Sequence, residues 1–248
     1  MLKLLLKIYG KLERWLVPEL RFSQYVFAEI LEGEIAQRPV WLDLGCGRCL
    51  FPDWMANQQS RVLSRTHWVV GVDVDADSLR DHVAYRDKAL ASAYQLPFAA
   101  GSFDLVSANM VVEHLAEPAR LLEEVRRVLK PGGRFLFHTP NRDSWLIRIA
   151  ARVPERIKLA LIRLLEQRVP EDVFPTHYRF NRKPDIEALA SQGGFRVIRL
   201  DLFSTCAATA ALGPVALFEL LWIRRLARPE YAKLRTQIMA VLEVSGPN

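Results

Sequence analysis

The stretch Val40-Trp41-Leu42-Asp43-Leu44-Gly45-Cys46-Gly47 decides the fold of this chain. Its apolar residues suit a strand that is buried on both faces of a parallel sheet. The two glycines that follow permit backbone torsions and close approaches that a Cβ atom would block. Asp43 places a carboxylate at the carboxyl end of this strand, where ligands of open α/β sheets bind. The stretch therefore predicts a ligand site at one edge of a parallel sheet.

A second strand brings another acid to the same edge. Trp68-Val69-Val70-Gly71-Val72 is apolar and ends in Asp73. Two acids beside a glycine turn indicate a cofactor of the nucleoside type. A nicotinamide dinucleotide is one alternative, because its fold also has a glycine turn and an acid on the next strand. However, the third glycine of the G-x-G-x-x-G fingerprint is absent, and Asp43 would repel a pyrophosphate while attracting an amino group and a sulfonium.

The pattern acid-x-Gly-x-Gly after the first strand resembles the first motif of the class I S-adenosylmethionine-dependent methyltransferases. Further segments are similar to later parts of these enzymes, in the family's order, from about Val40 to Asn141. They are residues 93–98, 101–106, 109–115, 129–134 and 135–138. The resemblance implies S-adenosylmethionine as the cofactor and methyl transfer as the activity.

Strands and helices alternate along the chain, which predicts an α/β fold with a parallel sheet flanked by helices. The resemblance implies a Rossmann-like sheet of seven strands, mostly parallel, with the last strand antiparallel between the fifth and the sixth. We expect one domain over residues 1–248, with a helical lid over 1–37 and an inserted helical region over 142–182 near the acceptor pocket. Helices are expected over 2–16, 21–36, 51–58, 75–84, 118–129 and 183–192, and the last two strands over 195–200 and 237–244.

The resemblance also implies a set of cofactor-binding residues. The acid that ends the second strand, Asp73, is expected to hold the ribose hydroxyls. The full expected set is Asp43, Gly45, Cys46, Gly47, Asp73, Val74, Ser92, Ala93, Asn109 and Met110. Two departures predict weaker binding: Cys49 stands where many members have a third glycine, and Ser92 stands where many have an acid for the adenine amino group. These departures leave a non-catalytic protein that only binds S-adenosylmethionine as an alternative.

Three histidines are candidate catalytic groups, because a general base with a pKa near neutrality assists methyl transfer to a hydroxyl. His114 follows the fourth predicted strand and His138 ends the fifth, so both are expected at the edge of the crevice. His177 and Tyr178 precede the helix at 183 and are expected to contact the acceptor. Each histidine also has a purely structural interpretation, as a helix cap, a core residue or a surface residue. His67 and His82 are expected at the surface.

Composition bears on the cellular compartment, on metal and redox chemistry and on the class of acceptor. With three cysteines in 248 residues no disulfide framework is expected, which favours a reducing cytoplasm. Cys46 and Cys49 form a C-x-x-C pattern, but within a cofactor loop we interpret them as small structural residues, and no metal site is expected. The net charge of +6 invites a nucleic-acid interpretation. Residues 109–112 read Asn-Met-Val-Val, unlike the Asn/Asp-Pro-Pro-aromatic motif of base-amino methyltransferases, so we expect a small-molecule acceptor.

Two apolar segments bear on membranes. Residues 2–16 predict a basic amphipathic helix, which packs on the domain as a lid or lies on anionic lipid. Residues 206–223 are apolar, but Gly213-Pro214 interrupts the run and Glu219 would be costly in lipid. A peripheral contact at the inner membrane face therefore remains open. The segment Thr139-Pro140-Asn141 after the fifth strand resembles methyltransferases that act on small molecules. Together these features suggest O-methylation of an amphiphilic, quinone-like, lipid or glycan-linked acceptor. The sequence does not indicate an oligomeric state.

Overall fold

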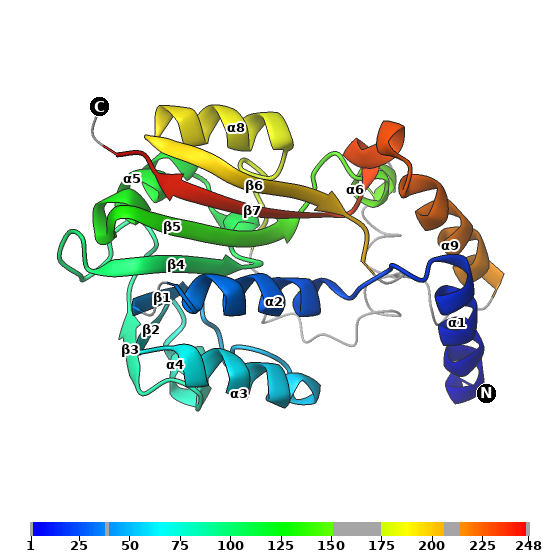
Figure 1. The fold of residues 1–248 in the computed structure, drawn as a ribbon, viewed down its shortest axis with the longest axis horizontal. Helices are drawn as coiled ribbons and strands as arrows, with labels where there is room; N and C mark the ends of the chain where they lie inside the picture. The colour runs from blue at the N-terminus through cyan, green and yellow to red at the C-terminus, as the bar shows by residue number, and fades with distance from the viewer. Residues whose placement is uncertain (1, 38–39, 151–174, 206–213, 247–248) are drawn as a thin grey trace.

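The computed structural model describes residues 2–37, 40–150, 175–205 and 214–246. At its centre is a seven-stranded sheet in the order β3-β2-β1-β4-β5-β7-β6 (Figure 1). Strands β1 to β5 run parallel, and β7 is antiparallel to both β5 and β6. This confirms the predicted sheet, including the place of its last strand. The strands are β1 Val40–Leu44, β2 Trp68–Asp73, β3 Asp87–Leu90, β4 Phe103–Asn109, β5 Leu129–Pro140, β6 Phe195–Phe203 and β7 Gln237–Val244.

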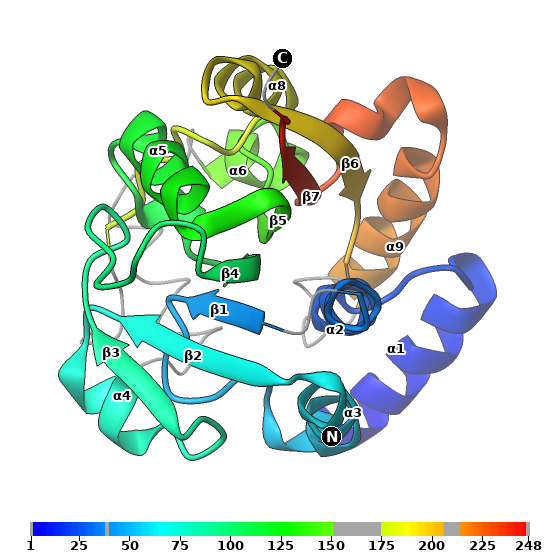
Figure 2. The ribbon, with the colours of Figure 1, turned by 60° about the vertical axis from the view of Figure 1, so that its left-hand side comes forward.

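Helices cover both faces of the sheet (Figure 2). Helices α2 (Ser23–Ile35) and α3 (Ala56–Arg65) lie on one face, and α5 (Pro118–Val128) and α8 (Lys183–Gln192) lie on the other. Side chains alternate along β1, so Leu42 and Leu44 pack toward α5 and α8 while Trp41 packs toward α2. Burial on both faces explains why β1 is apolar except for Asp43, and why β4 carries Leu105, Val106 and Ala108 in its middle.

The helix boundaries differ from expectation at two places. The helix expected over 51–58 is a 3₁₀ turn, η1 (Asp53–Met55), followed by α3, which runs on to Arg65. Helix α4 (Ala76–Asp81) is capped by the Asp75 side chain, as expected, but ends early because His82 is extended and turns inward. The prediction that His82 lies at the surface is wrong. Its ring is buried and stacks on Tyr85 at a centroid distance of 4.2 Å.

The two terminal helices form a separate pair. Helix α1 (Leu2–Leu16) packs on α9 (Pro214–Leu226), and Leu16, Leu220 and Ile223 form a small core between them. This pair stands at the end of the molecule toward which the arrowheads of β4 and β5 point (Figure 1). None of the helices in the described ranges is long and apolar enough to cross a membrane. Within the expected insertion the structure describes α6 (Trp145–Ala150); residues 151–174 and 206–213, which include Cys206, lie outside the described residues.

Candidate active site

The glycine turn after β1 is pressed against two neighbouring segments. The backbone N–H groups of Gly45 and Cys46 donate to the Val72 carbonyl at 2.7 and 3.0 Å, which ties the turn to β2. Gly45 has φ +68°, and a Cβ atom on it would lie 2.4 Å from Val111 Cγ2. The turn therefore requires glycine at this position, both for its torsion and for its contact with the segment that follows β4.

The Cys46 thiol lies beneath this turn, against Gly71. Burial and the nearby carboxylates of Asp43 and Asp73 raise the pKa of this thiol. Cys49 is exposed on the loop as a whole residue, but its thiol is partly shielded from solvent, and this shielding together with the nearby Asp53 carboxylate raises the pKa of the thiol as well. Because thiol nucleophiles and redox cysteines act as thiolates, these shifts favour the structural interpretation of the C-x-x-C pattern.

Asp73 joins the turn to β2 through its carboxylate. Its Oδ2 accepts a hydrogen bond from the Gly47 N–H at 2.8 Å, and its Oδ1 accepts one from the Asp75 N–H at 2.9 Å. An ionised carboxylate has about four acceptor positions. Asp73 can therefore accept two further hydrogen bonds, as a ribose with adjacent hydroxyls requires.

Asp43 lies below the turn, inside the protein. The strand register places it between Gly71 on β2 and Ser107 on β4. Ser107 Oγ donates to Asp43 Oδ1 at 2.5 Å, and the Tyr85 hydroxyl donates to Oδ2 at 2.9 Å. Burial raises the pKa of Asp43 to about 6, although both hydrogen bonds oppose this shift. Asp43 thus supports the turn from beneath, and its role as a cofactor ligand remains a prediction.

Sequence reasoning missed Tyr85 and Ser107, the two partners of Asp43. Tyr85 reaches the carboxylate because Gly71 has no side chain: a Cβ atom there would lie 2.7 Å from Tyr85 Cδ2. A glycine inside a strand often marks such a close approach. Ser107, a polar residue between the apolar residues Val106 and Ala108 of β4, was a second signal in the sequence that this part of the strand contacts a polar group.

A pocket of about 530 Å³ opens above the turn, at the carboxyl ends of β1, β2 and β4. This volume lies within the usual range for small-molecule and cofactor sites. Seven residues of the predicted cofactor set line it, and Asp43, Cys46 and Asn109 do not. The lining residues are Leu44, Gly45, Gly47, Val72, Asp73, Val74, Ser78, Ala91, Ser92, Ala93, Tyr94, Met110, Val111, His114, Leu115, Ala116 and Pro175.

The pocket suits a ligand with a hydroxylated sugar and an apolar ring. Asp73 supplies the acceptors for the sugar, and Val72 and Leu115 supply apolar surface. Ser92 Oγ accepts a hydrogen bond from the Tyr94 N–H at 3.2 Å, and its own hydroxyl hydrogen can be donated to a ligand. These residues fit S-adenosylmethionine, with a hydroxyl in the place of the acid that many relatives use for the adenine.

His114 is the predicted catalytic histidine that lines the pocket. It ends a 3₁₀ turn, η2 (Val112–His114), and its Nδ1 lies 3.1 Å from the Pro175 carbonyl oxygen. This contact requires a hydrogen on Nδ1, so Nε2 is the basic nitrogen of the neutral ring. The Glu113 Oε1 atom lies 4.0 Å from that Nε2. The site therefore contains one imidazole whose basic nitrogen is defined by its surroundings.

Glu113 connects three segments around the pocket. Its buried carboxylate accepts from Thr139 Oγ1 at 2.9 Å, and Thr139 Oγ1 in turn accepts from Asn181 Nδ2 at 2.5 Å. Its backbone carbonyl accepts the N–H groups of His177 and Tyr178 at 2.7 and 3.2 Å. Burial raises the pKa of the Glu113 carboxyl. These contacts hold the loop before α8 beside η2.

Two of the predicted residues in these segments have left-handed backbones: Met110 at φ +60° and Tyr178 at φ +51°. Such torsions are uncommon outside glycine and cluster at ligand sites. Met110 lines the pocket, and Tyr178 is half-buried. The His177 side chain is exposed and does not line the pocket.

His138 lies in the core, and the half-buried Asn109 contacts it. His138 Nδ1 is 2.9 Å from Asn109 Oδ1, and Nε2 is 3.0 Å from Gln237 Oε1. The rings of Phe27 and Phe203 pack near the imidazole. Burial lowers the pKa of His138 to about 4, so it is neutral at physiological pH. Its position matches the structural interpretation of a satisfied core residue.

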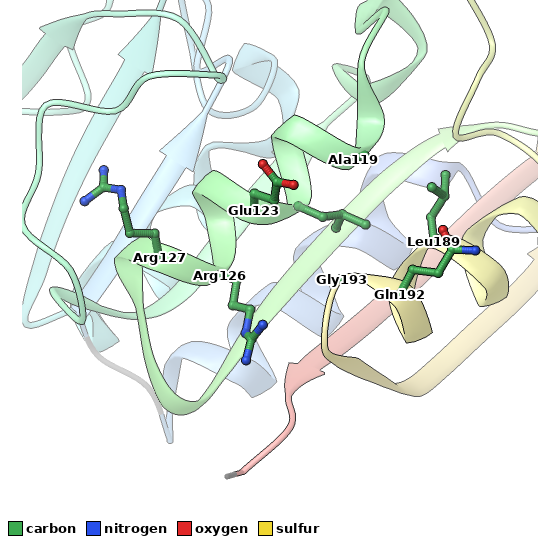
Figure 3. Close-up of a pocket in the computed structure, with 8 residues that line it drawn as sticks. Ala119, Glu123, Arg126, Arg127, Leu189, Gln192 and Gly193 are labelled. Carbon is green, nitrogen blue, oxygen red and sulfur yellow. The ribbon is translucent and has the colours of Figure 1, made fainter.

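A second hollow, of about 600 Å³, lies between α5 and α8 (Figure 3). It contains none of the predicted site residues. One of its arginines, Arg127, is held by the Glu124 carboxylate and by the carbonyls of Leu96 and Phe98. Because the hollow lies away from the carboxyl edge of the sheet, we place the candidate site at the glycine turn. The residues that line the hollow between α5 and α8 are Ala119, Leu122, Glu123, Arg126, Arg127, Leu189, Gln192 and Gly193.

Comparison with known proteins is consistent with this placement. Residues 42–137 match the family described as "Methyltransferase domain". A ubiquinone biosynthesis O-methyltransferase of Idiomarina loihiensis is 32% identical over 123 residues, which cover 44% of this chain and 46% of that protein. A "Probable S-adenosylmethionine-dependent methyltransferase" of Mycolicibacterium smegmatis is 33% identical over 138 residues, covering 52% and 51%.

The solved structures agree in fold. The crystal structure of an S-adenosylmethionine dependent methyltransferase from Mesorhizobium loti superimposes with a TM-score of 0.54 at 19% identity, covering 87% of this chain and 96% of that one. The chain spans about half the length of the two curated relatives named above. The matched part contains β2, β3 and β4 and most of β1 and β5, and with them the glycine turn and Asp73.

Proposed function

We propose that this chain, whose residues 42–137 match the family described as "Methyltransferase domain", is a class I S-adenosylmethionine-dependent methyltransferase that acts on a small-molecule acceptor. One observation carries the proposal. Asp73 and the glycine turn lie on the wall of a single pocket of about 530 Å³, and Asp73 retains acceptor positions for ribose hydroxyls.

The chain's own residues contribute binding and orientation. Bound S-adenosylmethionine supplies a methyl group on a positively charged sulfur. Methyl transfer requires the acceptor atom to approach that carbon in line, so placement supplies much of the rate acceleration. We assign Asp73 to the ribose and Ser92 to the adenine side of the pocket. Met110 and Val111 would border the reacting end.

The acceptor atom we propose is a hydroxyl oxygen. A hydroxyl must lose its proton as it is methylated, and a nearby base assists this step. His114 is our candidate base, because it lines the pocket and presents Nε2 as its basic nitrogen. The buried, neutral ring of His138 and the exposed ring of His177 are weaker candidates. Tyr178 and His177 remain proposed acceptor contacts beside Glu113.

We further propose that the acceptor is amphiphilic, with a quinone-like, lipid or glycan-linked structure. The apolar side chains of Met110, Val111 and Leu115 on the pocket wall support an acceptor with an apolar part. The likeness to an enzyme named for O-methylation in ubiquinone biosynthesis also supports it. The departures at Cys49 and Ser92 keep a non-catalytic binding protein as the second candidate.

The test is a screen for methyl transfer. Purified protein is incubated with S-adenosylmethionine and lipid or quinol fractions, and mass spectrometry detects products that gain one methyl group. We expect O-methylated products, and His114→Gln should lower kcat by about a hundredfold or more while leaving cofactor affinity unchanged. His67→Gln, at an exposed histidine, is the matched control. Cofactor binding without any product would favour the non-catalytic candidate.

A further inference from the structure

Helix α9 has an apolar face that no described element covers. Ala216, Leu220 and Ile223 point inward, toward the α1 side of the helix pair. On the opposite face Leu217, Phe218 and Leu221 are 39%, 71% and 45% exposed. Residues three and four apart on a helix are neighbours, so these three side chains form one continuous patch. Patches of this kind mark interaction surfaces more often than single exposed apolar residues do.

The same helix continues into basic residues. Arg224, Arg225 and Arg228 follow the apolar patch and are exposed. The acidic residue among positions 214–228 is Glu219, which is 7% exposed and lies on the inward face. In the sequence, Glu219 argues against contact with lipid. In the structure its carboxylate lies on the inward face of α9, so the outward face can contact lipid without burying this charge. Within α9 this face is apolar and positively charged, and the next exposed acid along the chain is Glu230, in the 3₁₀ turn that follows the helix.

Helix α1 covers the inward face of α9. Its residues Leu12 and Leu16 pack toward α9. The exposed side chains Lys7, Lys11, Arg14 and Trp15 lie on the side of α1 that is turned away from α9, so they do not adjoin the apolar patch. The docking surface is therefore the outward face of α9 alone. The chain as a whole carries a net charge of +6.

We propose that the outward face of α9, with the arginines that follow it, docks on an anionic phospholipid surface. Leu217, Phe218 and Leu221 enter the headgroup region, and the arginines that follow contact lipid phosphates. No helix in the described part of the chain spans a membrane, so the contact is peripheral. A second copy of the chain fits this face less well, because α9 offers no exposed acid to meet the arginines of its partner.

The position of this surface agrees with a membrane-borne acceptor. Helices α1 and α9 stand beyond the carboxyl ends of β4 and β5, the edge at which the pocket opens (Figure 1). The docked helix and the pocket therefore stand at the same edge of the sheet. Docking itself does not depend on methyl transfer, so its test is separate from that of the proposed activity.

The experiment is flotation of the full chain with vesicles. Vesicles of phosphatidylcholine alone are compared with vesicles of equal parts phosphatidylcholine and phosphatidylglycerol, at low and high salt. We expect flotation with the anionic vesicles and loss of it at high salt. Phe218→Ser with Leu221→Ser should lower the partition coefficient by about tenfold or more. Arg224→Gln with Arg228→Gln should lower it by about fivefold for each charge removed.

Matched controls lie elsewhere on the surface. Val83→Ser removes an apolar side chain that is 93% exposed, and Arg86→Gln removes an exposed charge; both should float as the wild type does. Equal binding to neutral and anionic vesicles would overturn the proposal. So would wild-type flotation of the Phe218/Leu221 variant. Sedimentation that shows this variant abolishing a dimer, with no effect on flotation, would assign the face to a second copy instead.

Discussion

The substitution Gly45→Ala tests whether the glycine turn is as tightly placed as its contacts indicate. An alanine at φ +68° has an unfavourable backbone, which costs about 1–2 kcal/mol. Its Cβ would also lie 2.4 Å from Val111 Cγ2, and overpacking of this kind costs about 1–3 kcal/mol. We therefore expect Gly45→Ala to lower the free energy of unfolding by about 2–5 kcal/mol.

Gly101 provides the matched control for the backbone cost. It has φ +66°, and a Cβ atom on it would meet nothing within 4 Å. Gly101→Ala should therefore cost only about 1–2 kcal/mol and leave cofactor affinity unchanged. The difference between the two variants isolates the contact with Val111.

A double-mutant cycle measured by urea denaturation completes the experiment. Val111→Ala removes the two methyl carbons that the new Cβ would meet at 2.4 and 3.0 Å, so it should recover about 1–3 kcal/mol in the Gly45→Ala background. Isothermal titration with S-adenosylmethionine should show weaker binding to Gly45→Ala. The reasoning is refuted if Gly45→Ala is no less stable than Gly101→Ala, or if Val111→Ala recovers nothing.

Three further predictions concern the buried groups around the site. Burial raises the pKa of Asp43 from 3.8 to about 6. The contribution of Asp43 to the free energy of unfolding should therefore fall by roughly 3 kcal/mol as the pH rises from 3.8 to 6. Urea denaturation of Asp43→Asn should not show this fall. Burial lowers the pKa of His138 from 6.5 to about 4. The stabilising contribution of the neutral ring to the free energy of unfolding, roughly 3 kcal/mol, should be present above pH 6.5 and lost as the pH falls through 4. His138→Gln should not show this loss. Gly71→Ala places a Cβ 2.7 Å from Tyr85 Cδ2 and should destabilise by about 1–3 kcal/mol, whereas Gly33→Ala in α2, with nothing within 4 Å, should stabilise by about 0.5–1 kcal/mol.

Much of the fold is predictable from local sequence. The apolar strands at β1 and β2 and the glycines that follow β1 are continuous signals within a few residues. Strand β3 is less predictable, because Asp87-Lys88-Ala89-Leu90 is short and carries two charged residues. The start of α3 was missed because Asp53–Met55 forms a 3₁₀ turn that residue type alone does not distinguish from a helix. The inward turn of His82 depends on its stacking with Tyr85, which is a tertiary contact.

The candidate site also contains residues that the sequence identifies and residues that only the tertiary structure reveals. Residues within the turn and at strand ends, such as Gly45 and Asp73, are identifiable by position. The partners of Asp43 are not, because Tyr85 and Ser107 lie 42 and 64 residues further along the chain. Their approach depends on strand register and on the missing side chain at Gly71. Sequence reasoning also treated Asp43 as a pocket residue, although the alternation of β1 turns its side chain into the protein.

Titration of Asp73→Asn with S-adenosylmethionine tests the central claim most directly. The amide cannot accept hydrogen bonds from the turn, from Asp75 and from two ribose hydroxyls together, and hydrogen bonds to charged groups contribute about 1.5–3 kcal/mol each. Isothermal titration should show wild-type binding and a loss of affinity of about tenfold to a hundredfold in Asp73→Asn. Asp77→Asn, at an exposed carboxylate on α4 outside the pocket, should bind as the wild type does. Equal affinity of the wild type and Asp73→Asn, or no binding to either, would contradict the account.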